Sequence, residues 1–149
     1  MKPTEEPAVL LLAEDDSDDR LLIKDALEEC QWRGELRCVE NGEDLLDYLL
    51  HRGTYKDAAA PRPGVILLDL NMPRKDGRQA LREIRADASL RRLPVVVLTT
   101  SKADTDIDQL YELGANSFVT KPVQFDALVS VIRMLSQYWF KTVQLPALR

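Results

Sequence analysis

The chain has 149 residues, of which 45% are hydrophobic and 30% are charged, and its formal net charge is −5. This composition is typical of a folded globular domain and excludes a chain that low hydrophobicity and high charge keep disordered. A mildly acidic chain has no general attraction for nucleic acid or for an anionic membrane, so we expect direct contact with neither.

The chain contains few side chains of the kinds that bind zinc or form histidine-based triads. It has two cysteines, Cys30 and Cys38, and one histidine, His51. Without a second cysteine pair or further histidines, we expect neither a zinc site nor a Ser-His-Asp triad. The apolar run near the N-terminus is short and has acidic flanks, unlike a signal peptide or a membrane anchor. We therefore expect a cytoplasmic protein.

In chain order, five short apolar runs alternate with segments of helical periodicity. The runs cover residues 9–13, 36–39, 65–70, 95–98 and 117–119. The third and fourth runs lack polar alternation, which is typical of strands covered on both faces. After each run, apolar residues recur at spacings of three and four, as on one face of a helix. We expect Asp16 or Ser17 to cap the first helix and Gly114 to end the fourth.

Strands that alternate with single helices favour a parallel sheet, because each right-handed crossover places a helix on one face of the sheet. We therefore predict an α/β fold with a doubly wound, five-stranded parallel sheet and five helices. Residues 1–149 are expected to form a single domain, with a core over about 8–140 and a C-terminal tail over 141–149. Residues 54–64, which contain two prolines, are expected to form a surface loop.

Polar side chains follow four of the five predicted strands. Ligands of an open doubly wound sheet bind at the carboxyl ends of its strands, so we expect these side chains to meet at one rim. They are Glu14, Asp15 and Asp16 after the first strand, Asp69 and Asn71 at the third, Thr99 and Thr100 at the fourth, and Lys121 after the fifth.

A cluster of carboxylates at this rim requires a positive partner. Two like charges ~4 Å apart repel by about 4 kcal/mol at an effective dielectric constant of 20, which is a large share of a stability of roughly 5–15 kcal/mol. A divalent cation relieves this repulsion, and Mg2+ fits best because the candidate ligands are all oxygens. Mg2+ also tends to share a phosphate of its substrate, and Lys121 supplies a cationic partner for such a phosphate.

Each of these side chains also has an ordinary structural explanation. The triplet Glu14-Asp15-Asp16 is compatible with a simple helix cap, the threonines with strand formation, and Lys121 with an exposed lysine. Asp69 fits this explanation poorly, because it interrupts an apolar run and a buried, unpaired carboxylate is costly. The coincidence of all four features at matching strand ends favours a functional site.

With these motifs in this order, the sequence resembles the receiver domains of two-component response regulators from residue 9 to residue 135. Within that family it is most similar to the stand-alone regulators associated with phytochromes. The second resemblance is carried by the insertion 54–64, the segments ILLDLNMPRKDGR and LTTS, and the tail from 138 to 146. The resemblance implies the flavodoxin-like strand order 2-1-3-4-5.

The resemblance also implies a role for each residue at the rim in phosphoryl transfer and metal binding. Asp69 is expected to be the phosphoryl acceptor, with Lys121 contacting the phosphate. Asp15, Asp69 and the backbone carbonyl of Asn71 are expected to bind Mg2+ directly, and Glu14 is expected to act through water. Glu14 stands where many members of the family have aspartate.

A conformational switch is implied in the same way. Thr99 is expected to supply the switch hydroxyl and to assist catalysis, with Thr100 beside it. Phe118, which stands where many members have tyrosine, is expected to change rotamer on activation. The bond between Lys121 and Pro122 is expected to be cis.

On this resemblance, we expect the chain to be the phosphoacceptor of a phosphorelay. The implied phosphoryl donor is a sensor histidine kinase, namely a phytochrome. The chain would catalyse its own phosphorylation and dephosphorylation without being a conventional enzyme. No glycine-rich phosphate-binding loop is present, so we expect no nucleotide site. Two alternatives stay open: a pseudo-receiver that acts as a scaffold without phosphorylation, and a flavodoxin-like cofactor binder, whose anionic ligand the acids after the first strand would repel.

The predicted last helix carries a second apolar strip beside the residues that face the core. This strip consists of Ala127, Val131, Met134 and Tyr138. Two apolar sides suggest two buried sides, so we expect a homodimer through helix 4, strand 5 and helix 5. The alternative is that residues 141–149 fold back over the strip. The segment that follows Phe140 is too short to form an output domain. We therefore expect the signal to pass through association with partners.

Overall fold

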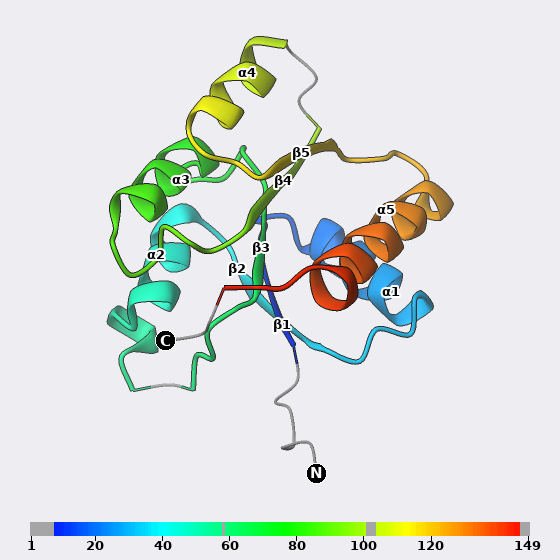
Figure 1. Ribbon diagram of the computed structural model, residues 1–149, viewed down its shortest axis with the longest axis horizontal. Coiled ribbons are helices and arrows are strands. Elements are labelled where there is room, and N and C mark those ends of the chain that lie inside the picture. The colour runs from blue at the N-terminus through cyan, green and yellow to red at the C-terminus, as the bar shows by residue number, and fades with distance from the viewer. Residues whose placement is uncertain (1–7, 58, 101–103, 147–149) are drawn as a thin grey trace.

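The computed structural model describes residues 8–57, 59–100 and 104–146, and strands and helices alternate along them (Figure 1). The strands are β1 (Val9–Ala13), β2 (Glu35–Val39), β3 (Val65–Leu68), β4 (Val95–Thr99) and β5 (Ser117–Thr120). The α-helices are α1 (Ser17–Glu29), α2 (Gly42–Leu50), α3 (Gly77–Ala86), α4 (Asp104–Glu112) and α5 (Phe125–Gln137). A 3-10 helix, η1 (Gly53–Tyr55), follows α2, and a π-helical turn, η2 (Tyr138–Thr142), follows α5.

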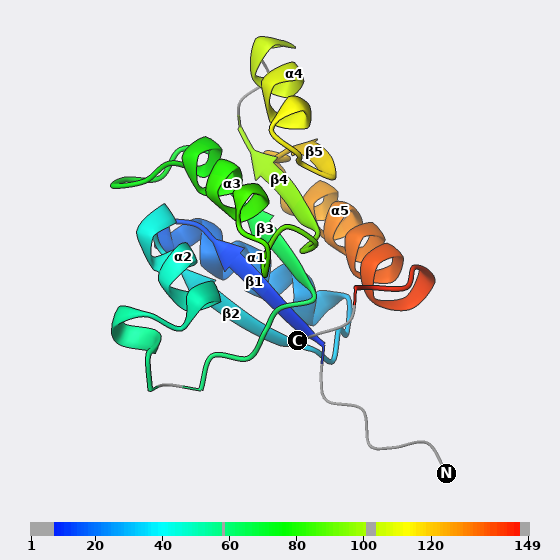
Figure 2. The same ribbon diagram turned by 60° about the vertical axis from the view of Figure 1, so that its left-hand side comes forward.

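The strands form one parallel sheet in the order β2-β1-β3-β4-β5. This order confirms the predicted doubly wound, flavodoxin-like fold. The helices α1 and α5 cover one face of the sheet, and α2 and α3 cover the other (Figures 1 and 2). Because β1 and β3 are neighbours, with Ala13 paired to Leu68, the loops that follow these two strands begin side by side.

Alternation along the strands divides the core into two parts. In β1, Leu11 and Ala13 pack with residues of α2 and α3, whereas Leu10 and Leu12 pack with residues of α1 and α5. Both faces of the central strands are therefore buried, which explains why the sequence shows continuous apolar runs there instead of polar alternation.

The strand β3 is shorter than the apolar run from which it was predicted. It ends at Leu68, so Asp69 and Leu70 belong to the loop that leads to α3, although both side chains are buried. Leu70 packs into the part of the core beneath α2 and α3. The boundary was missed because apolar character does not distinguish a strand residue from a buried loop residue. Because β3 ends at Leu68, Asp69 lies at the rim of the sheet.

Two local features fix the loops at this rim. Asp16 caps α1 as predicted, because its Oδ1 accepts hydrogen bonds from the N–H groups of Asp18 at 2.8 Å and of Asp19 at 3.1 Å. Gly77 begins α3 close to the backbone of Asp69, and a Cβ at this position would lie 2.6 Å from the Asp69 carbonyl oxygen. Glycine is therefore required for α3 to approach the site this closely.

The described residues of the segment 54–64, which begins within η1, are partly packed against the domain and are not merely a surface loop. Ala60 is buried, and Tyr48 Oη donates a hydrogen bond to the Pro61 carbonyl oxygen at 2.8 Å. The helix α2 thus holds this insertion in place.

None of the described helices is both long enough and apolar enough to cross a lipid bilayer.

The described part of the tail does not cover the second apolar strip. The Phe140 ring packs on Trp32 with a centroid distance of 5.4 Å, and Leu145 lies close to Gly64, just before β3. On the strip, Met134 is 56% exposed and Tyr138 is 49% exposed. Folding of the tail over the strip, which was the alternative to a dimer, is therefore wrong for the residues up to 146.

Candidate functional site

Three carboxyl groups meet at the carboxyl ends of β1 and β3. Glu14 and Asp15 follow β1, Asp69 follows β3, and one carboxylate oxygen from each lies within 4.8 Å of the other two. Glu14 and Asp69 are buried, whereas Asp15 is exposed. The structure thus brings together the acidic residues whose convergence the sequence predicts. Asp16 takes no part in this cluster, because its side chain caps α1.

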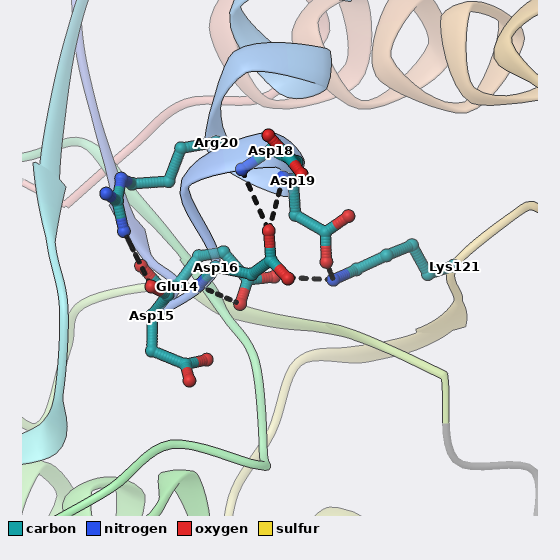
Figure 3. Close-up of polar contacts among 7 residues, drawn as sticks. All are labelled: Glu14, Asp15, Asp16, Asp18, Asp19, Arg20 and Lys121. Atoms are coloured by element: carbon teal, nitrogen blue, oxygen red, sulfur yellow. Dashed lines mark hydrogen bonds and ion pairs between the residues drawn. The ribbon is translucent and has the colours of Figure 1, made fainter.

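Lys121, which follows β5, reaches this acidic cluster. Its Nζ donates to Glu14 Oε1 at 2.5 Å and to Asp19 Oδ2 at 3.1 Å, as Figure 3 shows. The ion pair with Glu14 is nearly buried, with the two side chains 11% and 3% exposed. Sequence reasoning predicted Lys121 at this rim but missed Asp19, which lies in the first turn of α1.

Arg20 binds the backbone of Glu14 and Asp15. This contact was also not predicted from the sequence. Its Nη1 donates to the carbonyl oxygens of Glu14 at 2.9 Å and Asp15 at 3.0 Å, and its Nη2 forms an ion pair with Glu40 at 3.2 Å. The contacts with Glu14 and Asp15 are drawn in Figure 3, and the ion pair with Glu40 ties the loop after β1 to the loop after β2. An arginine six residues after Glu14 looks like a helix-surface residue in the sequence, so no pattern indicated this contact.

The charged groups of the cluster change one another's pKa values. Burial raises the pKa of Glu14 from its ordinary 4.5 to about 7; the hydrogen bond from Lys121 opposes this rise, and the charge of Asp69 adds to it. Burial alone would lower the pKa of Lys121, but its hydrogen bond to Glu14 and the charges of Glu14 and Asp69 outweigh burial and raise it. The pKa values of both partners are therefore raised, that of Glu14 mainly by burial and that of Lys121 by its anionic neighbours.

Thr99 ends β4 with an unsatisfied hydroxyl group. Its side chain is fully buried, and Oγ1 has no hydrogen-bond partner among the described residues. A buried polar atom without a partner costs free energy, so this hydroxyl is available to an incoming acceptor. The Lys121 N–H donates to the Thr99 carbonyl oxygen at 2.7 Å, which joins the two strand ends.

The other residues assigned to the switch or to the metal lie around this centre. Thr100 is exposed next to Thr99, and Asn71 is exposed two residues after Asp69. Phe118 lies within β5, opposite Val97, and packs against the core instead of standing at the rim. Its N–H donates to Tyr111 Oη of α4 at 3.1 Å.

The expectation of a cis bond between Lys121 and Pro122 is wrong for this structure. The peptide bonds of the described residues, this one included, are all trans. Trans is the preferred isomer of an X-Pro bond by about 0.5–1 kcal/mol, and Lys121 reaches Glu14 and Asp19 with the trans bond in place.

Comparisons with known proteins agree with this geometry. Residues 10–133 match the family model described as the response regulator receiver domain. The response regulator Rcp1 of Synechocystis sp. (strain ATCC 27184 / PCC 6803 / Kazusa) is 40% identical over 141 residues, which cover 95% of each chain.

Two solved structures extend this similarity to three dimensions. The crystal structure of the phosphorylated cyanobacterial phytochrome response regulator RcpA has a TM-score of 0.87 and 38% identity, covering 96% of this chain and all of that one. The crystal structure of the Mn2+-bound form of Rcp1 has a TM-score of 0.86 and 40% identity, covering 95% of this chain and 100% of that one.

Proposed function

Because the chain belongs to the response regulator receiver domain family, we propose that Asp69 accepts a phosphoryl group from the phosphohistidine of a sensor histidine kinase. The family model covers most of the chain, and we propose that residues 1–149 form one receiver domain that works in the cytoplasm. The observation that carries the proposal is the meeting of Glu14, Asp15 and Asp69 within 4.8 Å, beside the ammonium group of Lys121.

The donor set at the site fits Mg2+. The atoms that converge are carboxylate oxygens, and the cluster includes neither histidine nor cysteine. We assign direct binding to Asp15, Asp69 and the backbone carbonyl of Asn71, and binding through water to Glu14. When bound, the ion neutralises negative charge between the carboxylate and the phosphoryl group. The crystal structure of the Mn2+-bound form of Rcp1, a relative of this chain, supports a divalent cation here.

The chain's own residues supply the rest of the chemistry. A carboxylate oxygen of Asp69 attacks phosphorus in line, the P–N bond breaks, and its electron pair stays on the imidazole, which takes up a proton. Lys121 remains cationic and stabilises the phosphoryl oxygens. In the later hydrolysis, water attacks phosphorus and the bond between phosphorus and the Asp69 oxygen breaks. Its electron pair restores the carboxylate, and inorganic phosphate and a proton from the water are released.

Thr99 connects the phosphoryl group to the rest of the molecule. Its Oγ1 makes no hydrogen bond within the described part of the chain, so a phosphoryl oxygen would gain a donor at the end of β4. Formation of this bond would draw the backbone of Thr99 and Thr100 toward Asp69. Phe118, which is only half-buried, would then turn further into the core, and the signal would emerge on the face of α4, β5 and α5.

A phytochrome is the sensor kinase that the comparisons support. The solved structure of RcpA is described as that of a cyanobacterial phytochrome response regulator, and it covers 96% of this chain. Beside Lys121 the surface is hollowed, and exposed Leu22 and Val123 line this hollow. A hollow beside Lys121 with exposed apolar side chains suits contact with a kinase domain that must bring its histidine to Asp69.

We also propose that the protein is a homodimer through α4, β5 and α5. The strip on α5 remains uncovered by the described tail, with Met134 and Tyr138 about half exposed and Val131 partly buried. An uncovered apolar strip on a small domain is typical of an interaction surface. No direct contact with nucleic acid is proposed.

The proposal is tested by the mass of the intact protein after treatment with acetyl phosphate and MgCl2. We expect the wild type to gain one phosphate and Asp69→Asn to gain none. An unmodified wild type, or equal modification of both proteins, would contradict the proposal and favour the pseudo-receiver that acts as a scaffold.

A further inference from the structure

Lys121 is shared by two carboxylates, of which the proposed chemistry uses only Glu14. The second is Asp19, whose Oδ2 lies 3.1 Å from Lys121 Nζ (Figure 3). Asp19 comes from α1 and does not belong to the acidic cluster at the ends of β1 and β3. Its side chain is 34% exposed, against 3% for Glu14, so it is the more adaptable of the two partners.

The position of Asp19 is set by its helix and not by Lys121 alone. Its backbone N–H donates to the capping carboxylate of Asp16 at 3.1 Å, which fixes the first turn of α1. With this turn in place, the Asp19 side chain lines the hollow beside Lys121, together with Leu22 and Thr100. Lys121 is therefore held from the α1 side before any phosphoryl group arrives.

The ammonium group of Lys121 carries one positive charge, and several negatively charged groups lie close to it. An ammonium group has three donors, and two of them are used by Glu14 and Asp19. Asp69 acts on Lys121 through its charge, and no hydrogen bond joins the two side chains within the described residues. One donor thus remains for a phosphoryl group on Asp69, but Asp19 shares the charge of the ammonium and opposes its movement toward that group.

We infer that Asp19 is a positioning residue that holds Lys121 on the α1 side and thereby limits the affinity of the site for a phosphoryl group. The inference rests on the proposed function. Removal of the Asp19 charge leaves more of the Lys121 charge for the phosphoryl oxygens. For a partly exposed ion pair, the expected gain in affinity is about two- to fivefold.

The experiment measures binding of beryllofluoride, a mimic of the phosphoryl group, to the Mg2+-loaded full chain by 19F NMR. The variants are Asp19→Asn, which removes the charge at nearly constant shape, Asp19→Ala, which also removes the hydrogen bond, and Asp19→Glu, which restores the charge. Asp18→Asn is the matched control, because Asp18 is the neighbouring residue of the same helix turn and its side chain forms no ion pair with the residues that the structure describes. Far-UV circular dichroism establishes that each variant is folded.

We expect Asp19→Asn and Asp19→Ala to bind beryllofluoride about two- to fivefold more tightly than the wild type, and Asp18→Asn and Asp19→Glu to bind it as the wild type does. The affinity for Mg2+ alone, measured by calorimetry, is expected not to rise in any variant, which separates this effect from a general rearrangement of the site. Equal affinities of Asp19→Asn and Asp18→Asn, or weaker binding by Asp19→Asn, would overturn the inference while leaving the proposed function intact. Failure of the wild type to bind beryllofluoride in a manner that depends on Asp69 would overturn both.

Discussion

At the scale of single residues, Glu14 governs how the metal-free site responds to pH. Its pKa is raised from 4.5 to about 7, mainly by burial, so the folded protein binds a proton that the unfolded chain has lost. This contribution to stability is fully present below pH 4.5 and is lost as the pH rises through about 7. The raised pKa of Lys121 has no effect in this window, because that group is cationic in both states.

We therefore predict that, in EDTA, the free energy of unfolding of the wild type falls by about 1–3 kcal/mol more than that of Glu14→Gln as the pH rises across this window. Glutamine keeps the shape of the side chain and cannot ionise. Urea unfolding at the two ends of the window measures the difference. Parallel pH profiles of the two proteins would show that Glu14 titrates normally.

The unpartnered hydroxyl of Thr99 gives a second prediction. Thr99→Val keeps the shape and the strand preference of the side chain while removing a buried, unsatisfied polar atom. The resting protein should lose no stability and should gain up to about 1 kcal/mol. Binding of beryllofluoride should weaken by about tenfold, because a hydrogen bond to a charged group is lost.

Thermal unfolding with and without Mg2+ and beryllofluoride checks both halves of this prediction. A resting Thr99→Val protein that is clearly less stable than the wild type would show that the hydroxyl has a partner. An unchanged shift of the melting temperature on adding the mimic would show that Thr99 does not contact the phosphoryl group.

The residues of the site were predictable from the sequence only where a strand end determines their place. Asp69, Glu14 and Lys121 follow strands of one parallel sheet, so their convergence follows from topology. Asp19 and Arg20 lie on α1, and the side from which a helix approaches the rim depends on its packing against the sheet. That packing leaves no local signal, so both contacts were missed.

At the scale of the elements, the approach of α3 to the site depends on Gly77. A Cβ here would lie 2.6 Å from the Asp69 carbonyl oxygen and 2.9 Å from Leu70 Cα, and neither backbone atom can move without shifting the acceptor loop. We predict that Gly77→Ala lowers the free energy of unfolding by about 1–3 kcal/mol and slows phosphorylation of Asp69.

The control for this prediction is Gln79→Ala, an exposed position of the same helix, which should change stability by less than about 0.5 kcal/mol. Denaturant unfolding and the rate of modification by acetyl phosphate are the measurements. A Gly77→Ala protein as stable and as reactive as the wild type would mean that α3 tolerates a larger distance from Asp69.

Element boundaries were less predictable than element types. The run 65–70 was taken as one strand, yet β3 ends at Leu68 because Leu70 is buried by α3 and not by pairing in the sheet. The course of the tail was not predictable either. Phe140 and Leu145 bury their side chains against Trp32 and near Gly64, and contacts so distant in sequence leave no periodic pattern.

At the scale of the whole molecule, the alternation of strands and helices and the order of the strands in the sheet were predicted. Five units of strand and helix admit few arrangements under the right-handed crossover rule, and the resemblance to receiver domains fixed the strand order. The described residues leave Met134 and Tyr138 of the strip on α5 about half exposed, which supports the proposed dimer.

For the dimer, we predict that Met134→Glu weakens self-association by about tenfold or more while the fold and the melting temperature of the monomer stay the same. Gln137→Glu places the same charge on an exposed position of α5 outside the strip and should have little effect. Sedimentation velocity over a range of concentrations measures both variants. A wild type that stays monomeric at high micromolar concentration, phosphorylated or not, would contradict the proposed dimer.

Phosphoryl transfer from a phosphorylated phytochrome histidine kinase tests the central claim most directly. The account predicts that, with Mg2+ present, the label passes from the kinase to the wild-type chain and not to Asp69→Asn, and that EDTA abolishes the transfer. Transfer to Asp69→Asn at the wild-type rate would contradict it, because the acceptor would then lie outside the cluster formed by Glu14, Asp15 and Asp69.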